Sequence, residues 1–165
     1  IRSKADDEWL ELFNNTLETL DLSQIEITMA GLGDGSLFLP DGRFLPPQSY
    51  LVIGANQGEE TLLAKDPDIV MPSLSLSNSK AGLRLINTED IVLDSLPTGA
   101  WLVGLNNTST NQRYSAQRMN FSDPGDSWVN WGHCSEGLLT VLNYHYWRES
   151  ARHHNCGTPW EVSLF

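Results

Sequence analysis

The sequence has few basic residues, few cysteines and no long apolar run. Ten Lys and Arg stand against 21 Asp and Glu, which gives a formal net charge of −11. A surface of this sign repels the phosphates of nucleic acids and the headgroups of anionic lipids. No apolar run approaches the ~20 residues that a membrane-spanning helix requires. We therefore expect no nucleic-acid partner and no membrane insertion.

The usual motifs of catalytic sites are also missing. The chain has no Gly-x-Ser-x-Gly elbow, no Walker loop and no His-Glu-x-x-His pair. The acidic pairs Glu59-Glu60 and Asp66/Asp68 lack the spacing of a calcium-binding loop, and we expect them to form solvated surface. The sequence thus predicts no enzymatic activity and no cofactor.

Short apolar runs separated by turn residues predict a chain of strands. The length of 165 residues suits one domain. Gly, Pro, Asn and Asp separate the runs, and no helical pattern alternates with them, which favours an all-β sandwich. The expected strands cover residues 8–14, 25–28, 50–54, 82–86, 91–94 and 114–119, and residues 55–72 are expected to form an exposed acidic loop.

Turn chemistry predicts two hairpins. Residues 82–86 and 91–94 flank a polar turn at residues 87–90. Asp41-Gly42 predicts a second hairpin, between residues 36–39 and 43–45, because these two residue types tolerate the positive φ of a tight turn.

Several of these segments, taken in order, resemble a known family. The segments are residues 7–14, 20–23, 38–42, 45–52, 74–78, 82–85 and 91–94, then Ser115-x-Gln117-Arg118, Trp131 and Gly157-Thr158-Pro159. The ordered set resembles the lamin-tail domain, an immunoglobulin-like β-sandwich found in nuclear lamins and in many bacterial cell-surface and secreted proteins. The elements near the C-terminus are similar to those of the bacterial members.

The resemblance implies an all-β, immunoglobulin-like β-sandwich with short hairpins and an irregular C-terminal segment. A single domain would cover residues 5–160, with a tail over residues 161–165. The implied activity is non-catalytic: attachment, assembly or ligand recognition in an extracellular or cell-surface protein. The residues implied to form the structural motif are Trp9, Asp94, Ser115, Arg118, Trp131, Thr158 and Pro159. Arg118 is expected to pair with a carboxylate such as Asp94 and so to hold loops in place.

Both cysteines and all four histidines lie between His133 and Cys156. Cys134 and Cys156 are 156 − 134 = 22 positions apart, and in a surface protein they most simply form a disulfide. Two unpaired thiols and metal ligands are the alternatives. His133, Cys134, His154 and Cys156 have the chemistry of a tetrahedral zinc site, although the adjacent pairs depart from the usual ligand spacing. This alternative predicts a metal-dependent enzyme or zinc-binding module centred on residues 133–156.

Aromatic residues gather near the C-terminus and predict a binding surface. Such side chains stack on sugar rings or anchor a protein partner, and packing in the core is the alternative. The expected partners are a protein or glycan at the cell surface, or a second copy of the chain. A structural subunit of a surface layer or filament is a further alternative function. The aromatic residues of the predicted surface are Tyr144, Tyr146, Trp147 and Trp160.

Overall fold

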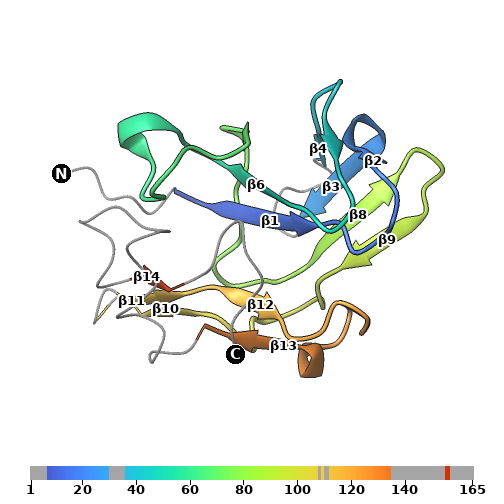
Figure 1. Ribbon diagram of the computed structural model, residues 1–165. Helices are drawn as coiled ribbons and strands as arrows, with labels where there is room; N and C mark the ends of the chain where they lie inside the picture. The colour runs from blue at the N-terminus through green and yellow to red at the C-terminus, as the bar shows by residue number, and fades with distance from the viewer. Residues whose placement is uncertain (1–6, 30–35, 108, 110–111, 135–154, 157–165) are drawn as a thin grey trace.

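The regular secondary structure of the described residues is almost entirely β-strand (Figure 1). The computed structural model describes residues 7–29, 36–107, 109, 112–134 and 155–156. These residues form fourteen strands and three short 3-10 turns, and no α-helix lies within the described ranges. The prediction of an all-β fold is therefore confirmed.

The strands form five sheets: one of four strands, two of three strands and two of two strands. The four-stranded sheet and the three-stranded sheet that includes residues 9–13 have the longest strands, and we call them the two larger sheets. The four-stranded sheet has the order β4 (Ser36–Phe38), β3 (Ile25–Met29), β8 (Leu83–Asn87) and β9 (Val92–Ser95). The larger of the two three-stranded sheets has the order β1 (Trp9–Phe13), β6 (Tyr50–Gly54) and β7 (Ile69–Val70). The smaller sheets pair β2 (Leu20–Asp21) with β5 (Phe44–Leu45), β12 (Ala116–Arg118) with β13 (Trp131–His133), and β11 (Gln112–Tyr114) with both β10 (Leu105–Asn107) and β14 (Asn155–Cys156). The 3-10 turns are η1 (Leu22–Gln24), η2 (Gly58–Glu60) and η3 (Trp128–Asn130).

Strand β3 illustrates why these residues form sheets. Ile25, Ile27 and Met29 are buried, whereas Glu26 and Thr28 between them are partly exposed. Because side chains alternate between the two faces of a strand, the three apolar side chains lie on one face. Full burial of side chains of this size stabilises the fold by ~1.5–3 kcal/mol each. All five residues of β3 pair with the antiparallel strand β8.

One apolar cluster joins the two larger sheets. Leu10 and Leu12 of β1 pack against this cluster. Because its members come from both sheets, the sheets share one core, as an immunoglobulin-like sandwich requires, and the sandwich itself stays a prediction. The buried members are Leu22, Ile25, Ile27, Met29, Leu37, Leu39, Leu45, Leu51, Ile53, Ala55, Ile69 and Leu74.

The hairpin predicted around Asp41-Gly42 is wrong. A turn does occur there, with Gly42 at a φ of +72°. However, β4 pairs with β3, and β5 pairs with β2, so the strands on either side of the turn belong to different sheets. These separate partners place Leu39 and Leu45 in the core, each only 3% exposed. Burial of Leu39 and Leu45, and not the turn between them, thus determines which strands β4 and β5 pair with.

The hairpin predicted for residues 82–94 is confirmed as the antiparallel pair β8 and β9. Asn87 shapes its turn, because the Asn87 Oδ1 accepts hydrogen bonds from the N–H groups of Glu89 (3.0 Å) and Ile91 (2.9 Å). Asp90 adopts a positive φ of 61° in the same turn. The expected strand at residues 50–54 is also confirmed, as β6 in the middle of its sheet.

The interpretation of residues 55–72 as an exposed acidic loop is right only in part. Asp66 and Asp68 are exposed, but Thr61 and Leu63 are buried. The carboxylates also hold the backbone, since Asp68 Oδ2 accepts the N–H of Val52 at 2.8 Å. Burial of Leu63 and Ile69 therefore packs this segment against the sheet beside β6.

Candidate functional site

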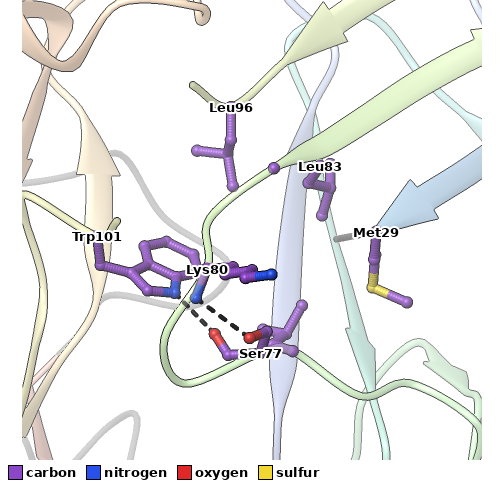
Figure 2. Close-up of a pocket in the computed structure, with 8 residues that line it drawn as sticks. Met29, Ser77, Lys80, Leu83, Leu96 and Trp101 are labelled. Carbon is purple, nitrogen blue, oxygen red and sulfur yellow. Dashed lines mark hydrogen bonds between the residues drawn. The ribbon is translucent and has the colours of Figure 1, made fainter. Parts of the chain in front are cut away.

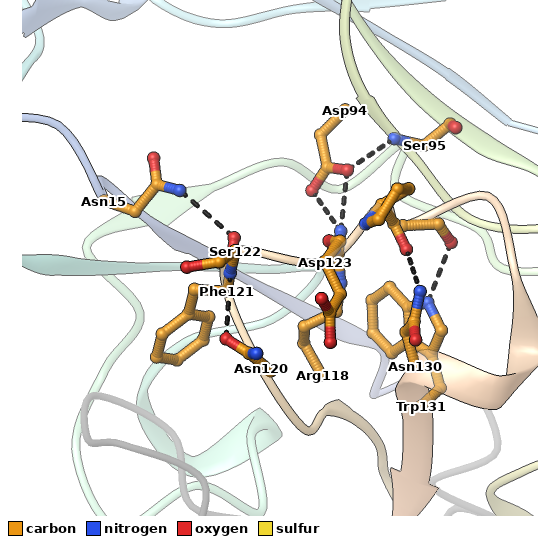
Figure 3. A network of polar contacts seen from close by, with 12 residues as sticks. Asn15, Asp94, Ser95, Arg118, Asn120, Phe121, Ser122, Asp123, Asn130 and Trp131 are labelled. Carbon is orange, nitrogen blue, oxygen red and sulfur yellow. Dashed lines mark hydrogen bonds and ion pairs between the residues drawn. The ribbon is translucent and has the colours of Figure 1, made fainter.

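Arg118, the last residue of β12, is the centre of a polar network (Figure 3). Its side chain is only 10% exposed, whereas that of Asp94 is 49% exposed. The Arg118 Nη2 donates to both carboxylate oxygens of Asp94, at 2.6 Å each. The Nη1 donates to the carbonyl oxygen of Asp123. The structure thus brings together Arg118 and Asp94, which the sequence analysis names as partners.

Trp131 supports the guanidinium from β13. Arg118 and Trp131 lie opposite each other in the β12–β13 pair. The central carbon of the guanidinium is 4.7 Å from the centroid of the Trp131 ring, which is within the range of a cation–π interaction. The Trp131 Nε1 donates to the carbonyl oxygen of Gly125 at 2.8 Å. One tryptophan therefore contacts both the arginine and the loop that the arginine holds.

Gly125 fits this network because it has no side chain. A Cβ at this position would overlap Arg118 Nη2, the Ser95 carbonyl oxygen and Asp94 Oδ1. The loop backbone can approach β9 and Arg118 this closely only with glycine. We call Asp94, Arg118, Gly125 and Trp131 the Arg118 clasp.

The Arg118 clasp covers one end of β9, an edge strand of the four-stranded sheet. The Leu96 N–H donates to Leu83 of β8, so the backbone groups of Ser95 face away from β8. The Ser95 N–H donates to Asp94 Oδ1 at 2.9 Å, and the Ser95 carbonyl lies against Gly125. This end of the edge is therefore already occupied.

The other end of the β9 edge is open. Ile91, Val92 and Leu93 are 51%, 49% and 51% exposed. Ile91 directly precedes β9, and the β8–β9 register shifts between Leu85 and Ile86, so β9 carries a bulge at Leu93. We call these three residues the open β9 edge.

An aromatic contact connects the loop after β12 to the sheet of β1, β6 and β7. The Phe13 ring lies 4.5 Å from the Tyr50 ring and 4.4 Å from the Phe121 ring, measured between centroids. The Asn15 Nδ2 donates to the carbonyl oxygen of Phe121. Burial, together with the negative charge of Glu11, raises the pKa of the Tyr50 phenol above its usual 10.0. The loop after β12 is thus held at both ends.

Of the other residues named from the sequence, some lie apart from the Arg118 clasp. Trp9 begins β1, where it pairs with Gly54. Ser115 lies between β11 and β12, and its carbonyl oxygen accepts the N–H of Cys134. The expected strand over residues 114–119 is divided at Ser115. The predictions for Tyr144, Tyr146, Trp147, His154, Thr158, Pro159 and Trp160 fall outside the described residues.

The two cysteines flank the same short segment of backbone. Cys134 is 2% exposed, and its N–H donates to the carbonyl oxygen of Ser115 at 3.2 Å. In β14, Cys156 pairs with Tyr114, the neighbour of Ser115. Among the described residues there is no free cysteine. The pairing of Cys134 with Cys156 stays a prediction.

The described part of the chain contains no group of three or more His, Cys, Asp or Glu arranged to hold a metal ion. Of the predicted zinc ligands, His133 is exposed at the end of β13 and Cys134 is buried. The backbone of Cys156 is described, and His154 falls outside the described residues. The zinc hypothesis therefore stays untested.

The cavities lined by described residues include a smaller and a larger one. The smaller has a volume of about 10 Å³, enough for about one water molecule. Figure 2 shows Trp101 beside it, with the Trp101 Nε1 donating to the Ser77 carbonyl oxygen at 2.7 Å. The larger, about 260 Å³, lies beside Glu8, Asn56 and Leu74. Both are smaller than the ~300–1,000 Å³ typical of small-molecule sites.

Comparisons with protein-family models, with curated proteins and with solved structures found no match for this chain. The described residues contain no helix of the length and apolar character that a membrane span requires.

Proposed function

We propose that this chain is a non-catalytic interaction or structural module of an extracellular or cell-surface protein, similar to the bacterial lamin-tail domains. The ordered sequence motifs support the proposal, as do two sheets that share one core. The module would occupy residues 5–160 and serve attachment, assembly or ligand recognition.

The open β9 edge is the observation that carries this proposal. Apolar side chains that lie exposed together on a protein surface often mark a site of contact with a partner. Here the Arg118 clasp covers the end at Ser95, while three apolar side chains at the other end remain about half exposed.

We further propose that Cys134 and Cys156 form a disulfide. Their contacts to the adjacent residues Ser115 and Tyr114 support this pairing, because both cysteines meet the same backbone segment. A disulfide would suit an oxidising extracellular environment. In the chain-entropy model, a loop of this length stabilises the fold by ~3 kcal/mol.

A binding experiment with three proteins tests the proposed function: the wild type, Leu93→Lys, and Phe38→Lys as the control. Phe38 is 69% exposed on β4, at the opposite edge of the same sheet. Each protein, at up to about 100 μM to capture weak binding, is assayed against the cell-surface fraction of its source, a glycan array and itself. Wild type and Phe38→Lys should bind one of these, and Leu93→Lys should lose that binding.

Two results would contradict the proposal: wild type that binds none of the three targets, or Leu93→Lys that binds as well as the wild type. Near-ultraviolet circular dichroism of each variant establishes that a loss of binding does not reflect unfolding.

A further inference from the structure

We propose that Asp41 is a site of isoaspartate formation, a modification that reroutes the main chain through the carboxyl group of its side chain. The reaction proceeds in water without an enzyme or cofactor, and the inference does not depend on the proposed function. Three observations on the described residues carry it: the exposed Gly42 after Asp41, the unpaired carboxylate of Asp41, and the position of this turn between two sheets.

The reaction begins with attack of the Gly42 backbone nitrogen on the Cγ of Asp41. A bond forms between these two atoms, and the hydroxyl of the carboxyl group leaves as water together with the amide proton of Gly42. The product is a cyclic succinimide, which water then opens at either ring carbonyl. Opening at the main-chain carbonyl gives isoaspartate, and opening at Cγ restores aspartate. Water is thus the only co-reactant, and nothing is oxidised or reduced.

Gly42 leaves its backbone nitrogen open to this attack. Gly42 is exposed, and a Cβ at this position would contact nothing within 4 Å beyond its chain neighbours. Among the described residues, no acceptor forms a hydrogen bond with the Gly42 N–H. The φ of +72° lies in the left-handed region, which glycine adopts without strain. Neither a side chain of its own nor a crowding neighbour therefore shields the nitrogen.

The Asp41 carboxylate has no partner that would hold it away from Gly42. Within the described part of the chain, this exposed side chain accepts no hydrogen bond and joins no ion pair. Asp94 provides the contrast, because it also precedes a small residue, Ser95. Both oxygens of Asp94 accept hydrogen bonds from Arg118, and its Oδ1 also accepts the N–H of Ser95. A carboxylate fixed in this way should react far more slowly than that of Asp41.

The turn is anchored on both sides, so the product should alter the fold. Before the turn, the Leu39 N–H donates to the carbonyl oxygen of Ile25 at 3.3 Å. After the turn, the Arg43 carbonyl oxygen accepts the N–H of Leu22 at 2.9 Å. Isoaspartate adds a methylene group to the main chain between these hydrogen bonds. Because β4 and β5 pair with strands of different sheets, a longer link between them should lower the stability of the fold.

Ageing of the whole chain tests the inference, with Asp41→Glu as the matched control. Glutamate keeps the negative charge, but its longer side chain would have to close a larger ring, which forms much more slowly. Both proteins are kept in warm neutral buffer for several weeks, and near-ultraviolet circular dichroism establishes that the variant is folded. Protein-isoaspartate methyltransferase with labelled S-adenosylmethionine then measures the isoaspartyl groups in each separated peptide.

The measurement is made peptide by peptide because the sequence contains a second Asp-Gly pair, Asp34-Gly35, which falls outside the described residues. Isoaspartate should form at least about tenfold faster at Asp41 than at Asp94, which corresponds to a difference of about 1.4 kcal/mol between the two barriers. Asp41→Glu should abolish methyl acceptance by the peptide that contains residue 41. In urea, where Arg118 no longer holds Asp94, the ratio of the two rates should become smaller.

The inference is overturned if the peptide with Asp41 accepts no more methyl groups than that of Asp41→Glu, or if Asp94 reacts as fast as Asp41. A ratio that urea leaves unchanged would refute the role given to the folded contacts. Hydrophobic-interaction chromatography separates the isoaspartyl form, and its Tm should be lower than that of the unmodified chain by about 2 °C or more. An equal Tm would refute the effect on the link between β4 and β5.

Discussion

Substitution of Arg118 by alanine should lower the free energy of unfolding by about 3 kcal/mol. The charged hydrogen bonds to Asp94 contribute roughly 1.5 kcal/mol, at the low end of their usual range, because water can replace the arginine at a carboxylate that is 49% exposed. The cation–π contact with Trp131 adds about 0.5–1 kcal/mol, and the bond to the Asp123 carbonyl adds a similar amount. For a chain of this length, the expected fall in Tm is about 6–12 °C.

Urea denaturation and differential scanning calorimetry measure this effect, with Arg118→Lys as the matched control. Lysine keeps the positive charge but lacks the planar guanidinium that donates to Asp94 and Asp123 at the same time. It should therefore restore less than half of the free energy of unfolding that Arg118→Ala loses. A double-mutant cycle with Asp94→Ala should give a coupling energy of about 1–2 kcal/mol. If Arg118→Ala costs less than about 0.5 kcal/mol, as an ordinary surface substitution would, then the Arg118 clasp does not stabilise the fold.

Gly125→Ala perturbs the same network without removing a charge. Its new Cβ would overlap Arg118 Nη2 and Asp94 Oδ1, so the loop must move away from β9. We expect a loss of stability comparable to that of Arg118→Ala. A Gly125→Ala protein as stable as the wild type would contradict the close approach described for this loop.

Three further predictions follow from buried polar groups and the cysteines. Asn14→Ala should lower the free energy of unfolding in urea by about 3 kcal/mol, since Asn14 is 1% exposed and its Nδ2 donates to three carbonyl oxygens; a loss under about 1 kcal/mol would refute this role. Tyr50→Phe should leave stability at pH 7 unchanged or higher, because the Tyr50 hydroxyl has no hydrogen-bond partner among the described residues. Folding raises the pKa of Tyr50, so the phenol ionises at a lower pH in the unfolded chain than in the folded one. The free energy of unfolding of the wild type should therefore fall as the pH rises above 10.0. Urea denaturation should find a smaller fall in Tyr50→Phe. Finally, intact mass spectrometry should find alkylation of Cys134 and Cys156 only after reduction, whereas two reactive thiols, or one zinc in the native mass, would exclude the disulfide.

The parts of the fold that local chemistry determines could be predicted from the sequence. Strand β3 has its own period of two, and the β8–β9 hairpin has its own turn at Asn87. The pairing of β4 and β5 could not be predicted in this way. It depends on where Leu39 and Leu45 become buried, and this in turn depends on strands far away in the chain.

The candidate site divides in a similar way. The sequence names Arg118 and Asp94 because a strand arginine needs a carboxylate partner. It gives no sign that Gly125 must approach both, because a glycine beside a proline is typical of any turn. Ile91-Val92-Leu93 resembles a buried strand in sequence, and its exposure depends on which other elements cover it. The open β9 edge could therefore be found only in the folded chain.

The turn at Asp41-Gly42 also has a consequence for local unfolding of the protein. The segment around it places Leu39 and Leu45 in one apolar cluster, although their strands belong to different sheets. Fraying of β4 would expose Leu39 and pull on the short link to Leu45, so β4 and β5 are expected to open together. Local opening of a protein occurs in cooperative units of this kind. Two edges that look independent in the sheet order would then share one rate of hydrogen exchange, as parts of a single unit that opens and closes.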